Sequence, residues 1–290
     1  MVPSGRAYTA IFAIAAVASC GGSREAAPDS DVPSSTSFTF EATFMRGAGT
    51  PPQKLTLRGR EASVLVTESP SEKTAVGRFS AVIDDGARVA LEQAMREAPS
   101  GTPAPAPGAP AIRCSMTSGG QQTERVFGQP PSAAGLRTLL ARIQLVEQVA
   151  LAHPREAIRL ELAAPTGPID AGRRAVIRLR VQNAGSDPLT VVFDGAPSIE
   201  AAPAPKPARA GETPLPPEWA RVGGASPGVA LLHLPAGAQV ELPAELMIAD
   251  SGPAALRAKF DGALALTGQT NESMHFHAML VSRATSIDVR

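Results

Sequence analysis

The sequence predicts an α+β protein in two parts: an N-terminal two-layer α+β domain at residues 37–153, followed by an all-β sandwich at residues 155–290. Three observations lead to this prediction. The period of the apolar residues changes between about two and about 3.6 in the first part, it stays near two in the second part, and the prolines concentrate in the tether and in the stretches 98–110 and 201–217, outside the periodic segments. A length of 290 residues is also enough for about two domains.

The composition excludes two classes of protein. The chain has 27 basic and 27 acidic residues, so it lacks the excess of positive charge with which nucleic-acid-binding proteins neutralise phosphates. Its two cysteines are too few for a disulfide-stapled scaffold. Because 43% of the residues are hydrophobic but only 4% are aromatic, we expect cores built from small side chains.

Residues 1–19 have the features of a secretory signal peptide. Arg6 precedes an uncharged stretch that ends at Ala18, and at about twelve residues this stretch is too short to cross the ~30 Å hydrocarbon core of a bilayer. It ends in Val17-Ala18-Ser19-Cys20, which resembles the lipobox of bacterial lipoproteins. The resemblance implies that Cys20 receives diacylglycerol, that residues 1–19 are removed, and that the new amino group is acylated. The alternative is an ordinary secretory signal followed by a cysteine by chance.

Lipid on Cys20 would hold the chain at a membrane, because two or three acyl chains contribute about 0.8 kcal/mol per buried methylene group. Gly21, rather than aspartate, after the cysteine resembles the pattern of lipoproteins that reach the outer membrane of Gram-negative bacteria. Residues 20–36 are rich in Gly, Ser, Pro and Asp and predict a flexible tether. We therefore expect a protein of the cell envelope, at the outer membrane, with its folded part in the periplasm or at the cell surface.

The first domain is predicted to contain strands, a helix, a hairpin and a second helix. Asp84 and Asp85 are suited to cap the first helix, which would bury Leu91 and Met95, and Ser132 is suited to cap the second. Alternating apolar residues predict strands at 38–44, 55–57, 64–66, 76–81, 112–116 and 126–127.

From residue 155 onward the pattern is that of a β-sandwich. Pro235–Gly237 and Asp261–Gly262 are predicted to form tight turns, and the proline-rich stretches 98–110 and 201–217 are predicted to be extended loops. Short alternating runs predict strands at 158–162, 175–181, 189–193, 229–234, 240–242, 256–260, 276–281 and 286–289.

The segments Gly172–Gly185, Pro188–Phe193 and Leu256–Gly262 resemble the immunoglobulin-like domains of bacterial envelope and secreted proteins. The resemblance implies an immunoglobulin-like β-sandwich and leaves its function open. The same segments are similar to the intracellular proteinase inhibitor family, and the order of elements in the first domain is loosely similar to emfourin, an inhibitor of metalloproteases.

A few residue types could carry chemistry. His275 and His277 lie two apart on a predicted strand and share one face, a spacing that could hold a metal ion if His233 and Glu272 joined them. A solvated strand face is the favoured alternative, so we predict no metal site. Trp219 is the single tryptophan and is either an exposed anchor for a binding partner or a plug at one end of the sandwich.

Cys114 alternates with Ile112 and Met116, which favours a buried strand position over a reactive thiol. No catalytic motif or phosphate-binding loop is found, so no catalytic residue and no cofactor is predicted. We expect a membrane-anchored envelope lipoprotein that acts as a non-catalytic binding or structural module. Its partners would be the membrane, through lipid on Cys20, and another envelope protein, with no nucleic acid. The alternative function is inhibition of proteases in the envelope.

Overall fold

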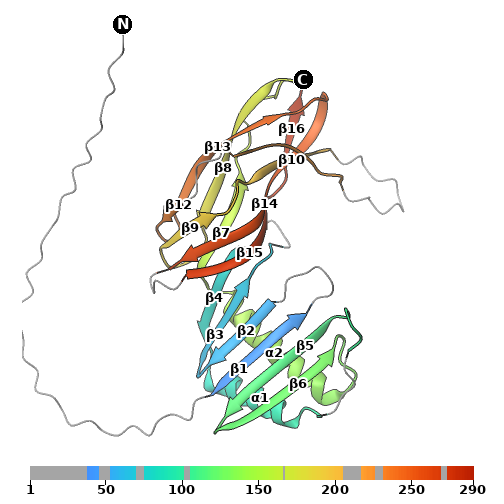
Figure 1. The fold of residues 1–290 in the computed structure, drawn as a ribbon, viewed down its shortest axis with the longest axis vertical. Helices are drawn as coiled ribbons and strands as arrows, with labels where there is room; N and C mark the ends of the chain where they lie inside the picture. The colour runs from blue at the N-terminus through green and yellow to red at the C-terminus, as the bar shows by residue number, and fades with distance from the viewer. Residues whose placement is uncertain are drawn as a thin grey trace, which may run out of the picture. The chain divides into compact units, whose positions relative to one another are not determined.

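The computed structural model describes residues 38–45, 53–69, 75–100, 105–165, 167–204, 217–225, 231–268 and 273–290. They belong to one compact unit, Thr36–Arg290 (Figure 1). The predicted signal peptide, the tether and Cys20 lie outside the described residues, so these predictions stay predictions.

Six antiparallel strands form the first half of this unit, in the order β4-β3-β2-β1-β5-β6. Each predicted strand of this half is confirmed, and the side chains alternate as the sequence pattern requires. Phe40, Ala42 and Phe44 of β1 are buried on one face, whereas Thr39 and Thr43 lie on the other. The strands are β1 (Thr39–Met45), β2 (Gln53–Arg58), β3 (Glu61–Val66), β4 (Val76–Val82), β5 (Ala111–Ser118) and β6 (Gln121–Gly128).

Two helices, α1 (Asp85–Glu97) and α2 (Ala134–Leu151), pack on the buried face of these strands (Figure 1). The cap of α1 is confirmed, because the Asp84 carboxylate accepts a hydrogen bond from the Ala87 amide at 2.7 Å. The predicted Ser132 cap is wrong: the cap position of α2 is Ala133, which has no side-chain acceptor. Neither helix of the described part is long and apolar enough to cross a membrane.

The second half is built from ten strands in the described residues. Two of them, β10 and β11, were not predicted, and β10 takes in the first residues of the stretch expected to be a loop at 201–217. The strands are β7 (Pro154–Leu162), β8 (Arg174–Asn183), β9 (Leu189–Phe193), β10 (Ser198–Pro203), β11 (Ala220–Ala225), β12 (Leu231–Leu234), β13 (Gln239–Met247), β14 (Gly252–Thr267), β15 (Ser273–Val281) and β16 (Thr285–Val289).

Strand β14 passes through two sets of neighbours. Its first part pairs with β10 and β16, and its second part pairs with β9 and β15. The predicted turn at Asp261–Gly262 is therefore wrong, because these residues pair with Met279 and Ala278 in the middle of the β14–β15 ladder. The predicted turn at Pro235–Gly237 is confirmed, with Gly237 at a φ of +69°.

The predicted fold class, a two-layer α+β domain followed by an immunoglobulin-like sandwich, is wrong. In the described residues the chain is mostly β, with two helices and a single 16-stranded antiparallel sheet that continues from the first half into the second. The link is β4, which pairs with β7 from Val76 and Ile158 to Phe79 and Pro154. This pairing joins residues far apart in sequence, so the local apolar period did not reveal it.

Two apolar cores flank this link, one in each half of the unit. Adjacent residues of β7 point into different cores: Ala157 belongs to the core under the helices, and Ile158 belongs to the core of the second half. Cys114 is fully buried in the first core, which confirms its predicted position. Burial raises the pKa of its thiol to about 12.

Candidate functional site

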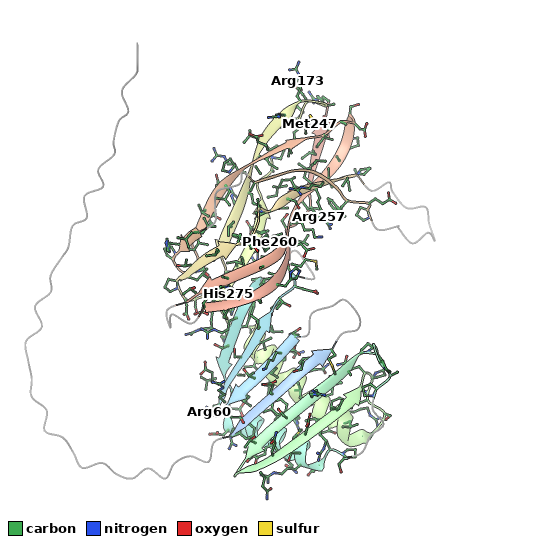
Figure 2. The ribbon with its side chains drawn as sticks, viewed as in Figure 1. Arg60, Arg173, Met247, Arg257, Phe260 and His275 are labelled. Carbon is green, nitrogen blue, oxygen red and sulfur yellow. The ribbon has the colours of Figure 1, made fainter. Side chains whose placement is uncertain are left out.

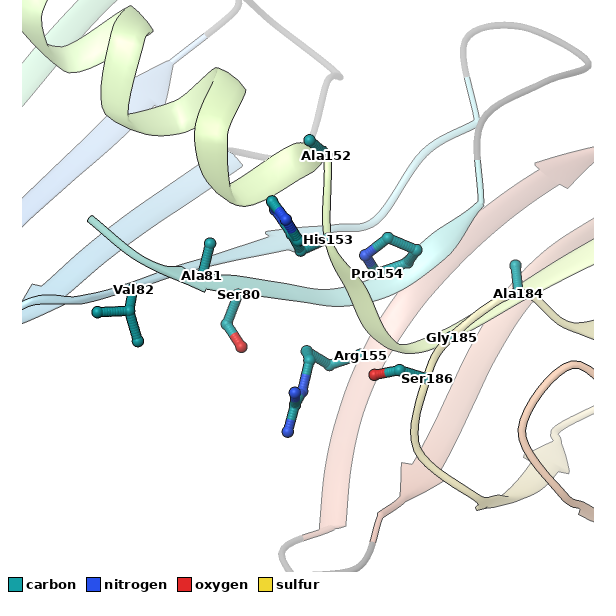
Figure 3. A pocket seen from close by; sticks show the side chains of 10 residues that line it. All are labelled: Ser80, Ala81, Val82, Ala152, His153, Pro154, Arg155, Ala184, Gly185 and Ser186. Atoms are coloured by element: carbon teal, nitrogen blue, oxygen red, sulfur yellow. The ribbon is translucent and has the colours of Figure 1, made fainter. Parts of the chain in front are cut away.

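A pocket of about 640 Å³ opens where β4, the end of α2 and the turn after β8 meet (Figure 3). We call it the β4 notch. The Ser80, Arg155 and Ser186 side chains project to the same side of the backbone (Figure 3). Its lining residues are Ser80, Ala81, Val82, Ala152, His153, Pro154, Arg155, Ala184, Gly185 and Ser186.

The notch exists because β4 runs on after its ladder with β7 has ended. The last paired position is Phe79 with Pro154, followed by one further hydrogen bond from the Ser80 amide to the His153 carbonyl at 3.0 Å. Beyond this point β4 has no partner on this side among the described residues, because residues 152–153 leave the sheet and connect β7 to the end of α2. Val82 is therefore left at the rim, with 68% of its surface exposed.

Asn183 shapes the opposite wall of the notch. Its side-chain amide donates to the carbonyl oxygens of Asp187, Leu234 and Pro235 at 2.8, 3.1 and 3.0 Å. Its oxygen accepts from the Gly185 amide at 2.9 Å. Because a buried polar group must find partners, these bonds fix the turn at 183–187 to the turn that follows β12.

Gly185 has its own steric role in this wall. A Cβ atom at this position would lie 2.1 Å from the Arg155 carbonyl oxygen, so only glycine allows the turn to approach β7. The Asn-Ala-Gly sequence, on which part of the immunoglobulin-like resemblance rested, is thus explained by hydrogen bonding and close packing.

The charges in the notch are paired locally. Arg155 Nε lies 3.2 Å from Asp187 Oδ2, and the Ser186 hydroxyl donates to the other oxygen of the same carboxylate at 3.1 Å. His153 Nδ1 lies 2.9 Å from the Val149 carbonyl, which ties the ring to the last turn of α2. The notch is suited to hold a polar group by hydrogen bonds.

Ser80 also belongs to the sheet face opposite the helices, which we call the open face. Its central row follows the strand registers as Ser80, Ser63, Thr56, Glu41, Ser115 and Glu124. A second pocket, of about 290 Å³, lies on this face over β2, β1 and β5. Lys54 pairs with Glu41 at 2.8 Å beside it, so the face offers hydroxyl groups and both signs of charge.

Trp219, the predicted binding residue, lies on the outer surface of the second half. The Arg257 guanidinium (labelled in Figure 2) stacks over its ring at 4.1 Å from the ring centre, and Glu200 accepts from Arg257 at 2.7 Å. Trp219 is half-buried by this stack. It is therefore held by a cation–π contact on the sheet surface.

The predicted histidine pair lies on the exposed face of β15. His275 Nε2 is 2.7 Å from the Ser273 hydroxyl, whereas His277 Nε2 is 2.9 Å from Asp261 Oδ1. A hydrogen bond from Lys259 is the main cause that lowers the pKa of Asp261, burial opposes it, and His277 adds to it. His233 lies on β12, where its Nδ1 is 2.8 Å from the Thr190 hydroxyl. The described residues contain no group of three His, Cys, Asp or Glu side chains that could hold a metal ion, and Glu272 lies outside them.

The sequence did not predict a buried ion pair at the link between the halves. Glu156, which is 1% exposed, lies opposite Arg78 in the β4–β7 ladder, with Arg78 Nη2 2.8 Å from its Oε1. Gly268 covers the carboxylate, since a Cβ there would lie 1.4 Å from Glu156 Oε1. Glu156 alternates in phase with Ile158 and therefore faces the same side, whereas only the cross-strand register shows that Arg78 is its partner.

No protein-family model matches the chain, and no curated protein sequence is similar to it. Among solved structures, the chain is similar to the ASH / PapD-like domain of human CEP192 (PapD-like domain 7), with 9% sequence identity and a TM-score of 0.23. The similarity covers 43% of this chain and 84% of that chain. At this TM-score the similarity carries no argument about function.

Proposed function

We propose that the chain is a lipid-anchored protein of the bacterial envelope whose β-rich unit acts as a non-catalytic binding or structural module. The observation that carries the proposal is Val17-Ala18-Ser19-Cys20 at the end of an uncharged stretch. This order of aliphatic, small and cysteine residues resembles the lipobox of bacterial lipoproteins, and the resemblance implies lipidation of the Cys20 thiol. Gly21 supports the outer membrane as the destination.

The charge of the chain agrees with a lipid anchor. Removal of residues 1–19 takes away Arg6 and no acidic residue, so the remaining chain stays near neutral. A single acyl chain binds a membrane only marginally and usually needs a polybasic segment beside it, whereas two or three chains do not. Lipid alone is then sufficient to hold this protein.

The open face and the β4 notch are the surfaces we assign to binding. Serine and threonine hydroxyls that lie in register across neighbouring strands can donate and accept hydrogen bonds along a polar partner. Ser80 belongs to both surfaces, so a partner on the open face could extend into the notch. This supports a binding role and assigns no reaction.

The anchor is tested by metabolic labelling with a palmitate analogue in a bacterial host. The wild-type chain and Cys114→Ser should both be labelled and recovered with membranes, because both retain Cys20. Cys114 is fully buried in the folded protein and is not expected to carry the label. Cys20→Ser should lose the label. Equal labelling of Cys20→Ser and wild type would refute the proposal.

The binding role is tested by charge on the open face. Thr56→Lys with Ser63→Lys should reduce recovery of envelope components that co-purify with the anchored chain. The control is Arg173→Glu, which changes the charge by the same amount in the opposite direction, far along the chain on a side chain that is 80% exposed. If both variants retain every component equally, the open face is not the binding surface.

A further inference from the structure

One strand edge of the second half is only partly paired in the described residues. Strand β15 pairs with β14 in an unbroken register from Lys259 and Val281 to Thr267 and Ser273. The other edge of β15 makes backbone hydrogen bonds near the C-terminal end of the strand. There the Ser69 amide donates to the Met279 carbonyl at 2.8 Å, and the Met279 amide donates to the Thr67 carbonyl at 2.9 Å. No other described strand pairs with this edge.

The direction of the free backbone groups follows from Met279. Residues two apart in a strand point their amide and carbonyl groups to the same side. Ser273, His275 and His277 alternate in phase with Met279, so their backbone groups face away from β14. The stretch Ser273–His277, which we call the β15 edge, thus presents a row of backbone donors and acceptors that pair with no other strand in the described part of the chain (His275 is labelled in Figure 2).

The other terminal strands are protected in ways that the β15 edge is not. The outer edge of β16 is covered at Ile169, whose amide donates to the Asp288 carbonyl at 3.0 Å. Strand β12 has only four residues, and β6 carries Glu124 and Arg125. Short length, covering segments and charged side chains are how proteins prevent strand pairing between molecules. The β15 edge has no lysine, proline or bulge.

The side chains of the β15 edge leave the second core open at this end. Met274 and Phe276 point to the core but are only half-buried, whereas the next residues on the same side, Ala278 and Leu280, are 0% and 1% exposed. A further strand along the β15 edge would cover Met274 and Phe276. It would also pair the free backbone groups beside them.

We propose that the β15 edge pairs with the β15 edge of a second copy of this chain, antiparallel about a two-fold axis at His275. In this register Met274 lies opposite Phe276 of the partner subunit, so the half-buried apolar residues of each copy cover those of the other. On the exposed face Ser273 lies opposite His277 of the partner subunit. A symmetric interface requires such self-complementarity.

This inference rests on the proposed function, because the lipid anchor is what would make the association between two copies strong enough. A ladder along Ser273–His277 buries less surface than the ~1,200 Å² typical of stable complexes, so we expect weak association in dilute solution. Copies held by lipid in one membrane meet at a much higher effective concentration. The pairing is therefore expected at the membrane.

Disulfide cross-linking of the full-length chain in bacterial membranes tests the pairing. In the proposed register position 275 lies opposite itself at a Cα–Cα distance of about 5.5 Å, which a disulfide can span. His275→Cys should give a disulfide-linked dimer under mild oxidation with copper phenanthroline, at least about tenfold more than Arg178→Cys. The Arg178 side chain is 71% exposed on β8 and serves as the control.

A second variant separates strand pairing from random collision. The His277 amide is not used by the β14–β15 hairpin, so His277→Pro should fold while it removes one donor of the β15 edge. Added to His275→Cys, it should abolish the dimer without lowering the melting temperature by more than a few degrees. A dimer that persists in the folded double variant overturns the proposal.

The remaining outcomes distinguish the pairing from the lipid anchor and from a different partner. Absence of a dimer above the control, while Cys20 takes up the palmitate analogue in the same membranes, overturns the pairing. Absence of both the dimer and the label overturns the lipid anchor, and with it the pairing that depends on this anchor. A dimer without labelling of Cys20 overturns the lipid anchor and leaves the pairing intact. A mixed disulfide from position 275 to another protein, without a homodimer, overturns the second copy as the occupant.

Discussion

Asn183 offers the sharpest test of how the second half is held together. It is fully buried, and its side chain makes four hydrogen bonds to the backbone of two turns. Two amide hydrogens serve three carbonyl oxygens, so the loss on removal corresponds to about three full bonds. At about 1 kcal/mol each, Asn183→Ala should lower the free energy of unfolding by about 3 kcal/mol.

The isosteric variant distinguishes hydrogen bonding from packing. Asn183→Asp keeps the volume and the acceptor for Gly185 but places a carboxylate against three carbonyl oxygens at neutral pH. It should be at least as destabilising as Asn183→Ala. Urea unfolding followed by circular dichroism gives both values, and Gln182→Ala, a half-exposed neighbour, should change stability by less than about 0.5 kcal/mol. If Asn183→Asp is as stable as wild type, the amide does not organise these turns.

Three further predictions concern the link and the first half. Gly268→Ala should cost about 1–3 kcal/mol because its Cβ would overlap the buried Glu156 carboxylate, whereas Gly167→Ala, with open space around it, should be neutral in thermal unfolding. The Cys114 thiol should react with an exposed-thiol reagent at pH 8 only when denaturant is added; rapid reaction of the native chain would contradict its burial. Its pKa is about 12 when folded and about 9 when exposed, so its contribution to stability is full below pH 9 and falls as the pH rises toward 12. Asp84→Ala should lower stability by about 1 kcal/mol by leaving the Ala87 amide without its cap, and Asp84→Asn should restore most of it.

Sequence reasoning succeeded where the signal was local. The strands of the first half alternate cleanly between Phe40 or Leu55 on one side and threonine on the other, and the cap at Asp84 depends on contacts within one turn. Burial of Cys114 followed from the same alternation. These features need no knowledge of which strand is the neighbour.

It failed where pairing overrode a local signal. Asp261–Gly262 has the composition of a tight turn, yet these residues are part of a continuous strand because they pair with β15. Strand β11 was missed because Gly223 and Gly224 disfavour strands in isolation. Gly223 is required there, since a Cβ would lie 2.0 Å from the Glu245 carbonyl oxygen of β13. The candidate surfaces could not be predicted from the sequence either, because the open face and the β15 edge are defined by cross-strand registers.

The link between the halves explains why the fold class was wrong. Gly77, Gly185 and Gly268, from three separate segments, all approach Arg155 and Glu156 at the start of β7, at distances that would leave no room for a Cβ atom. In a sequence such glycines are typical of turns or linkers. The predicted boundary between two domains rested on the change of apolar period near residue 154, which contains no information on pairing between distant strands. In the structure Gly77 and Gly185 let backbone pack on backbone, and Gly268 packs on the Glu156 side chain, so that the β4–β7 ladder and the Arg78–Glu156 pair can be covered. The position predicted as a boundary between two domains is therefore where β4 and β7 pair, and this pairing joins the strands of both halves into one continuous sheet.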